Sequence, residues 1–240
     1  MDNVKEQFTG LLQEKGLTVT EEQWNQFEAY YRELVSWNEK MNLTGITDRD
    51  QVYLKHFYDS ISLAFYIPMD SVSTMADVGS GAGFPSIPLK IMFPHLKVTI
   101  IDSLNKRIHF LTHLVSETGL SEVTSLHGRA EDMARKPELR DRFDLVTARA
   151  VARLNVLNEF CLPFVRKGGT FAAMKGSNPA EELDEAKGSL KKLNAVLHEV
   201  HSFKLPVELS DRHIMVIHKK DVTPKAYPRK AGTPLKSPLM

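Results

Sequence analysis

The chain has 240 residues, of which 42% are hydrophobic and 25% charged, a balance typical of a globular protein with a sizeable core. No apolar run approaches the roughly 18 residues of a membrane span, and the polar start MDNVKEQFTG does not resemble a signal peptide. The single cysteine, Cys161, excludes an intramolecular disulfide and a cysteine metal cluster, so we expect a cytoplasmic protein without a bound metal.

The net charge of +1 conceals two regions of opposite charge. Residues 1–66 hold 11 acidic and 6 basic residues, whereas residues 218–240 hold 1 acidic and 6 basic residues. A basic segment of this kind favours contact with phosphates. It is equally typical of a solvated, disordered chain end.

The first part of the chain predicts helices. Over residues 21–35, apolar side chains recur at helical spacing and should form a buried stripe: Trp24, Phe27, Tyr31, Leu34 and Val35. Thr20 followed by Gln23 predicts a capping box at the start of this helix. A loop at 42–47 and a further helix at about 48–66 should follow, ending before Pro68.

From about residue 73, short β-like runs alternate with helical runs. We expect strands at 74–78, 98–102, 123–127, 143–148, 169–174, 196–200 and 213–218, with helices at 85–93, 105–118, 149–165 and 179–191. This alternation predicts an α/β fold with a doubly wound, parallel sheet. No helix joins the last two strands, so they should pair antiparallel. The four prolines after residue 223 predict an extended arm, with no regular element.

The segment ADVGSGAGFP, after the first strand, carries the candidate ligand site. Gly79, Gly81 and Gly83 allow the backbone to approach a ligand, but their spacing lacks the third glycine position of dinucleotide-binding loops. Asp102, ending the next strand, is placed to accept hydrogen bonds from ribose hydroxyls. Asp77 would repel a pyrophosphate but suits the cationic end of S-adenosylmethionine. A purely structural role as a turn or cap acid is the alternative for Asp77.

Several further motifs occur along the chain: WNEKMNLT at 37–44, HFYDS at 56–60, DSLNKR at 102–107, GRAED at 128–132, ARA at 148–150 and YPRKAGTP at 227–234. Together with the glycine loop, they resemble the bacterial small-subunit ribosomal RNA methyltransferase G family, also called glucose-inhibited division protein B. The resemblance covers nearly the whole chain. Its most distinctive parts are the closing tail and the segment around His56.

The resemblance implies a class I S-adenosylmethionine-dependent methyltransferase fold, with a mostly parallel seven-stranded sheet, one antiparallel strand and an N-terminal helical cap. It implies methylation of N7 of guanosine 527 in 16S ribosomal RNA. The cap would span 1–68, the methyltransferase domain 69–222 and a basic tail 223–240. It also implies cofactor contacts at Gly79, Phe84, Ala130, Glu131 and Arg149, to which we add Ser103. A helix-start acid is the alternative reading of Glu131.

The residues expected around the site are consistent with methylation of a ring nitrogen. N7 of guanine has a free lone pair, so its methylation needs alignment and charge screening but no general base. The Asn/Asp-Pro-Pro-aromatic motif of enzymes that methylate exocyclic amines is missing after the fourth strand. Cys161, in an apolar helical run, is expected to fill the core and not to act as a nucleophile. We expect Arg149 to act catalytically; its alternative is a surface arginine paired with Asp144 or Glu131.

The remaining candidates concern RNA. We expect a substrate pocket that includes Asn42, His56 and Asp59, although a capping or interhelical hydrogen bond is the alternative for the last two. RNA contacts are expected at Lys106, Lys175, Lys225, Arg229 and Lys230. The protein should act as a monomer on 16S ribosomal RNA or the small ribosomal subunit. A nicotinamide oxidoreductase, and a non-catalytic assembly or RNA-binding factor on the same fold, are the alternatives.

Overall fold

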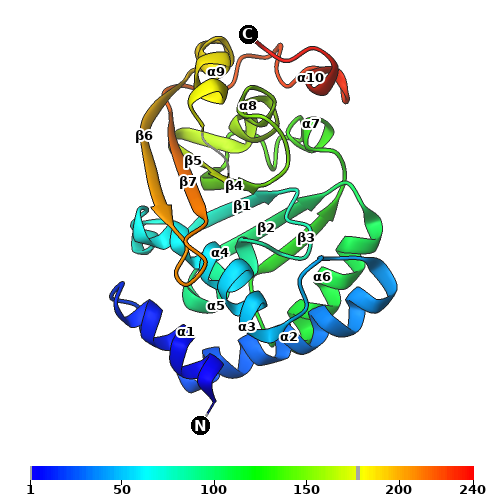
Figure 1. Cartoon of the computed structure of the whole chain (residues 1–240). Coiled ribbons are helices and arrows are strands. Elements are labelled where there is room, and N and C mark those ends of the chain that lie inside the picture. The colour runs from blue at the N-terminus through cyan, green and yellow to red at the C-terminus, as the bar shows by residue number, and fades with distance from the viewer. Residues whose placement is uncertain (1, 177–178) are drawn as a thin grey trace.

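The computed structural model describes residues 2–176 and 179–240. At its centre is one seven-stranded sheet with the strand order β3-β2-β1-β4-β5-β7-β6 (Figure 1). The strands are β1 Thr74–Val78, β2 Lys97–Asp102, β3 Val123–His127, β4 Phe143–Arg149, β5 Val165–Lys175, β6 Ala195–Lys204 and β7 Asp211–Lys219. Only β7 among these strands runs antiparallel to its neighbours, β5 and β6. The predicted class of sheet is therefore confirmed.

The N-terminal residues are helical, as predicted. The elements are α1 Asn3–Gln13, α2 Glu21–Met41, α3 Arg49–Val52, the π-helical turn η1 Tyr53–Tyr58, α4 Asp59–Ile61, and the 3-10 turns η2 Ser62–Phe65 and η3 Met69–Ser71. The capping box of α2 is confirmed, because Thr20 and Gln23 exchange both bonds, at 3.2 and 2.9 Å. The single helix expected at 48–66 is instead a run of four segments that differ in their hydrogen bonding.

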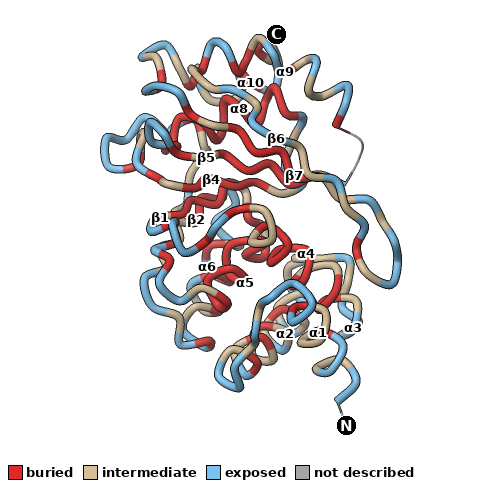
Figure 2. Tube along the Cα trace, turned by 90° about the vertical axis from the view of Figure 1, so that its left-hand side faces the viewer, coloured by how far each residue is buried: buried red, intermediate tan, exposed pale blue. Residues whose placement is uncertain are grey.

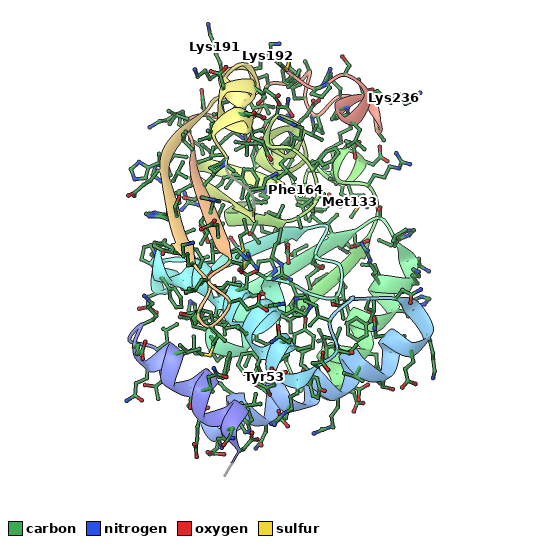
Figure 3. The ribbon with its side chains drawn as sticks, viewed as in Figure 1. Tyr53, Met133, Phe164, Lys191, Lys192 and Lys236 are labelled. Atoms are coloured by element: carbon green, nitrogen blue, oxygen red, sulfur yellow. The ribbon has the colours of Figure 1, made fainter. Side chains whose placement is uncertain are left out.

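Helices cover both faces of the sheet (Figures 1 and 2). One layer consists of the N-terminal helices with α5 Ser86–Met92 and α6 Asn105–Glu117. The other holds α7 Ala130–Met133, α8 Leu154–Cys161, η4 Leu162–Phe164 and α9 Ala180–Lys192. Figure 3 labels Tyr53 in the first layer and Phe164 in the second, both buried. Among the described residues, no helix combines the length and the hydrophobicity that a membrane span requires.

The apolar stripe of α2 is the centre of the first layer. Phe27 is fully buried and packs against Phe8 and Phe57, with ring centroids 5.2 and 5.1 Å apart. Tyr30 is fully buried, whereas the expected Tyr31 is only partly buried. The Tyr30 hydroxyl donates a 2.5 Å hydrogen bond to the carbonyl of Ala82 in the glycine loop. The N-terminal helices therefore contact the loop that follows β1, where the candidate site lies.

Further predictions about local structure are wrong. The sequence predicts a helix that begins at Pro85, but this residue occupies the N-cap position of α5. The prolines of the tail predict an extended arm, but the tail contains α10 Thr233–Lys236 and packs on the second layer. Pro234 is compatible with α10 because it lies in the first turn, where a backbone N–H has no partner within the helix and its absence costs nothing.

Candidate functional site

The glycine loop lies at the carboxyl end of β1 and is built from backbone conformations that side chains disfavour. Gly79, Gly81 and Gly83 all have positive φ, at 74°, 62° and 100°. A Cβ on Gly79 would lie 2.9 Å from Val151, and one on Gly83 would lie 2.9 Å from the Tyr30 hydroxyl. The loop therefore needs glycine for its shape and for its close packing.

Asp102 ends β2 beside this loop. One of its carboxylate oxygens accepts from the backbone N–H of Gly81 at 3.2 Å and from Arg107 Nη1 at 3.3 Å. The other accepts from the backbone N–H of Leu104 at 2.9 Å. The carboxylate is 2% exposed yet lines a cavity, so it fixes the loop and keeps lone pairs for a ligand.

Two adjoining cavities surround the loop and share residues, among them Gly79, Ser103 and Val151. The first, of about 380 Å³, is also lined by Gly81, Phe84, Asp102 and Arg149. The second, of about 410 Å³, is lined by Leu104, Gly128, Ala130, Glu131 and Leu235, among others. We call them the loop cavity and the β3-side cavity. The structure thus brings together most of the predicted cofactor residues.

Asp77 is fully buried in β1, directly before the loop, and lines neither cavity. Its Oδ2 accepts from the backbone N–H of Ser86 at 3.2 Å, while its Oδ1 has no partner among the described residues. Burial raises the pKa of this carboxyl to about 7. These contacts fit the structural alternative for Asp77, and its contact with a cofactor stays a prediction.

A third cavity, of about 350 Å³, adjoins the loop cavity and is lined by Ile46, Lys55, His56, Asp59, Arg149, Lys175, Arg212 and His213, among others. We call it the Asp59 cavity. Asp59 is 4% exposed, and its carboxylate accepts from two arginines, Arg149 Nη1 and Arg212 Nε, both at 2.9 Å. The alternative prediction, that Arg149 pairs with Asp144 or Glu131, is wrong. Arg149 pairs with Asp59, and Asp144 pairs with Arg166.

Arg149 and His56 line both the loop cavity and the Asp59 cavity. Both lie close to the Phe84 ring: the ring stacks on His56 with centroids 4.6 Å apart, and the Arg149 guanidinium lies 4.9 Å from its centroid. Burial and the charge of Arg149 lower the pKa of His56 to about 3, so this imidazole is neutral at pH 7. Its Nε2 lies 2.8 Å from Thr44 Oγ1. His56 can therefore shape the site but is a poor proton donor.

Other predicted residues have different surroundings. Asn42 is the exposed, left-handed C-cap of α2, and its neighbours Leu43 and Thr44 line the loop cavity instead. Lys175 lines the Asp59 cavity, but its ammonium pairs with Glu182 at 2.7 Å. Lys106 is exposed, and its Nζ lies 3.3 Å from the Met41 carbonyl oxygen.

The three predicted RNA contacts in the tail differ from one another. Lys225 and Lys230 are exposed. The Arg229 side chain instead binds the fully buried Glu159, with Nη2 and Oε2 2.7 Å apart. Sequence reasoning missed Glu159, Arg212 and Leu235. The one available signal was Glu159 itself, an acid within an apolar helix, because a buried carboxylate requires a partner.

Comparison with known proteins identifies the family. The family model described as rRNA small subunit methyltransferase G matches residues 23–215. Relatives named ribosomal RNA small subunit methyltransferase G occur in Brevibacillus brevis, 56% identical over 98% of this chain and 99% of the relative, and in Bacillus subtilis, 56% identical over 98% of each.

Solved structures show the same fold at low sequence identity. The cyclase SpnF aligns with a TM-score of 0.57 and 14% identity over 85% of this chain and 98% of that one. TrmN from Thermus thermophilus aligns with a TM-score of 0.50 and 18% identity over 68% of this chain and 48% of that one. One of these proteins is a cyclase, so the fold alone does not identify the reaction. The match over most of the sequence does identify the family, and the chain belongs to the rRNA small subunit methyltransferase G family.

Proposed function

We propose that this protein transfers a methyl group from S-adenosylmethionine to N7 of a guanine in 16S ribosomal RNA, at guanosine 527. The observation that carries the proposal is the adjacency of the loop cavity and the Asp59 cavity, which share His56 and Arg149. A methyl donor in one and a base in the other would meet at these residues. Family membership supports both the reaction and the choice of RNA.

The residues around the glycine loop fit S-adenosylmethionine. Asp102 offers carboxylate lone pairs for ribose hydroxyls, and the loop glycines admit a ligand close to the backbone. The β3-side cavity offers apolar walls from Leu104 and Leu235 together with the carboxylate of Glu131, which suits a purine and its polar edge. When bound, this cofactor supplies a methyl group on a positively charged sulfur.

The protein's own task is to bind, orient and exclude water. N7 carries a lone pair at neutral pH, so no residue has to remove a proton. Neutral His56 and the paired Arg149 agree with that requirement. We propose that the Asp59 cavity receives the guanine after it is extruded from the folded RNA, at a cost of a few kcal/mol. Arg149 would orient the base with charge-assisted hydrogen bonds.

The proposal also covers the setting of the reaction. We propose that the protein works as a monomer in the cytoplasm on 16S ribosomal RNA or the small subunit, and that Lys106, Lys225 and Lys230 contact phosphates. The division into a cap at 1–68, a methyltransferase domain at 69–222 and a tail at 223–240 stays a prediction. So do direct cofactor contacts by Ser103, Ala130 and Arg149.

The test combines binding and transfer. Purified protein should bind S-adenosylmethionine but not NAD in a calorimetric titration, and should transfer radiolabelled methyl to 16S ribosomal RNA. Binding of NAD alone would favour an oxidoreductase. RNA binding without methyl transfer to any form of the RNA would favour a non-catalytic assembly factor.

A further inference from the structure

The C-terminal tail, residues 223–240, reaches the β3-side cavity. Figure 1 shows it in orange and red, crossing the outer layer of helices and placing α10 near α7 and α8. Leu235 of α10 lines the cavity together with Leu104 and Val151. These three apolar side chains come from three separate segments and are 59%, 42% and 39% exposed. A flat apolar ligand between them would remove this surface from water.

The first anchor of the tail is an ion pair with α8. Glu159 is fully buried and accepts from the backbone N–H of Arg229 at 2.7 Å and from its side chain, with Nη2 to Oε2 at 2.7 Å. Arg229 Nη2 also donates to the carbonyl of Ser237, beyond α10, at 2.8 Å. A buried carboxylate without its partner is strongly destabilising, so this pair holds the tail firmly on the body.

The second anchor belongs to the cavity itself. Glu131 lines the β3-side cavity, and its Oε1 accepts from the backbone N–H of Gly232 at 2.8 Å. Gly232 is the N-cap of α10, with φ at 83°, so this bond fixes the start of the helix that carries Leu235. After α10, Leu239 is buried in the second layer. The position of Leu235 is therefore fixed from both sides.

We propose that the tail is the outer wall of the adenosine pocket, with Leu235 covering the adenine and with Arg229 and Gly232 positioning α10. This inference rests on the proposed function, because it assumes S-adenosylmethionine as the ligand. It gives Arg229 a role in cofactor affinity, whereas the exposed Lys225 and Lys230 are left for RNA. Glu131 then acts twice, as a cavity wall and as the anchor of the tail.

The test is calorimetric titration of the full chain with S-adenosylmethionine, without RNA. Leu235→Ser should raise the Kd about fivefold to tenfold, because a covering apolar side chain is lost. Lys236→Ser is the matched control: Lys236 is the next residue of α10, is exposed, projects outward in Figure 3 and does not line the cavity, so its Kd should stay within about twofold of wild type. Leu235 is largely exposed, so its loss should leave the fold intact.

A second variant tests the anchor. Arg229→Lys keeps the charge but loses the forked hydrogen bonds, and it should also raise the Kd for S-adenosylmethionine while leaving the salt dependence of RNA binding unchanged. Wild-type Kd values in both Leu235→Ser and Arg229→Lys would overturn the inference. If wild type binds the cofactor and Asp102→Asn weakens it while both tail variants bind normally, only the role of the tail fails. If wild type binds no S-adenosylmethionine, the proposed function fails as well.

Discussion

Arg149 and Asp59, which are 90 residues apart in the chain, form an ion pair at the boundary of the loop cavity and the Asp59 cavity, with Nη1 and Oδ2 2.9 Å apart. Asp59 comes from α4 in the N-terminal helices and Arg149 from the end of β4. Arg212, at the start of β7, binds the other oxygen of the same carboxylate. One carboxylate thus fixes two cations from distant parts of the fold beside the proposed site of the base.

This arrangement predicts that Asp59→Asn slows methyl transfer. Both arginines would lose their counter-charge and Arg149 its fixed orientation, so kcat should fall about tenfold to a hundredfold, because misplacement of an orienting group is costly. The free energy of unfolding should fall by about 3 kcal/mol, since a buried ion pair is broken. Single-turnover kinetics and urea denaturation measure the two effects.

The control for Asp59→Asn is Asp70→Asn, at an exposed acid of η3, which should change neither quantity. An unchanged kcat in Asp59→Asn would remove the positioning role of this carboxylate. A fall in stability alone, with normal turnover of the folded fraction, would leave Asp59 a purely structural residue.

The contacts of Asp102 predict weaker cofactor binding in Asp102→Asn. Loss of the negative charge weakens acceptance from ribose hydroxyls, and the Kd for S-adenosylmethionine should rise about tenfold, roughly 1.4 kcal/mol. Isothermal titration measures it, with the exposed Asp132→Asn on α7 as control. Equal affinities of the wild type and Asp102→Asn would count against the ribose role.

The burial of Asp77 predicts a pH-dependent stability. Its pKa in the folded protein is about 7, against an ordinary value of 3.8, so the folded state binds the proton more tightly than the unfolded state. Stability should therefore fall as pH rises from about 4 to about 7, because the unfolded chain loses this proton while the folded protein keeps it, and should level off above pH 7. Asp77→Asn should reduce this loss by about 2–4 kcal/mol between pH 5 and pH 8.

Urea denaturation at the two pH values gives the comparison for Asp77. The exposed Asp132→Asn should keep the pH dependence of wild type. If Asp77→Asn loses as much stability between pH 5 and pH 8 as wild type does, another group carries the effect.

The exposed lysines of the tail predict a salt-dependent contribution to RNA binding. Lys225→Gln with Lys230→Gln should weaken binding and reduce the slope of log K against log salt by about 1–2, one counterion per lost phosphate contact. The control is the double variant Lys97→Gln with Lys167→Gln, which changes the charge by the same amount. These two lysines lie near the starts of β2 and β5, at the edge of the sheet opposite the glycine loop. Equal slopes for the two double variants would show that the tail lysines lie away from the RNA.

Most of the fold could be predicted because it depends on local patterns. The strands at 74–78 and 123–127 and the start of α6 at Asn105 agree with the expected ranges, since short β-branched runs and helical periodicity are local signals. The antiparallel pairing of the last two strands followed from the missing helix between them. The four residues of α7 and the change to π geometry at Tyr53 have no periodic signal, and both were missed.

The residues of the candidate site that lie in one continuous motif could be predicted. Those that meet a partner distant in the sequence were missed. Gly79, Gly81, Gly83 and Asp102 follow from strand–loop–helix logic. Arg212, by contrast, meets Asp59 only after β7 is inserted between β5 and β6, which no local pattern specifies. The fold of the tail likewise depends on Glu159, an anchor 70 residues from Arg229.

The most direct test of the proposed reaction is to map N7-methylguanosine in 16S ribosomal RNA after incubation with the purified protein and S-adenosylmethionine. We expect the modification at one guanosine, number 527, and its loss with Arg149→Ala. Cofactor and RNA that both bind, without any methyl group at guanine N7 in naked RNA or in the small subunit, would contradict the account.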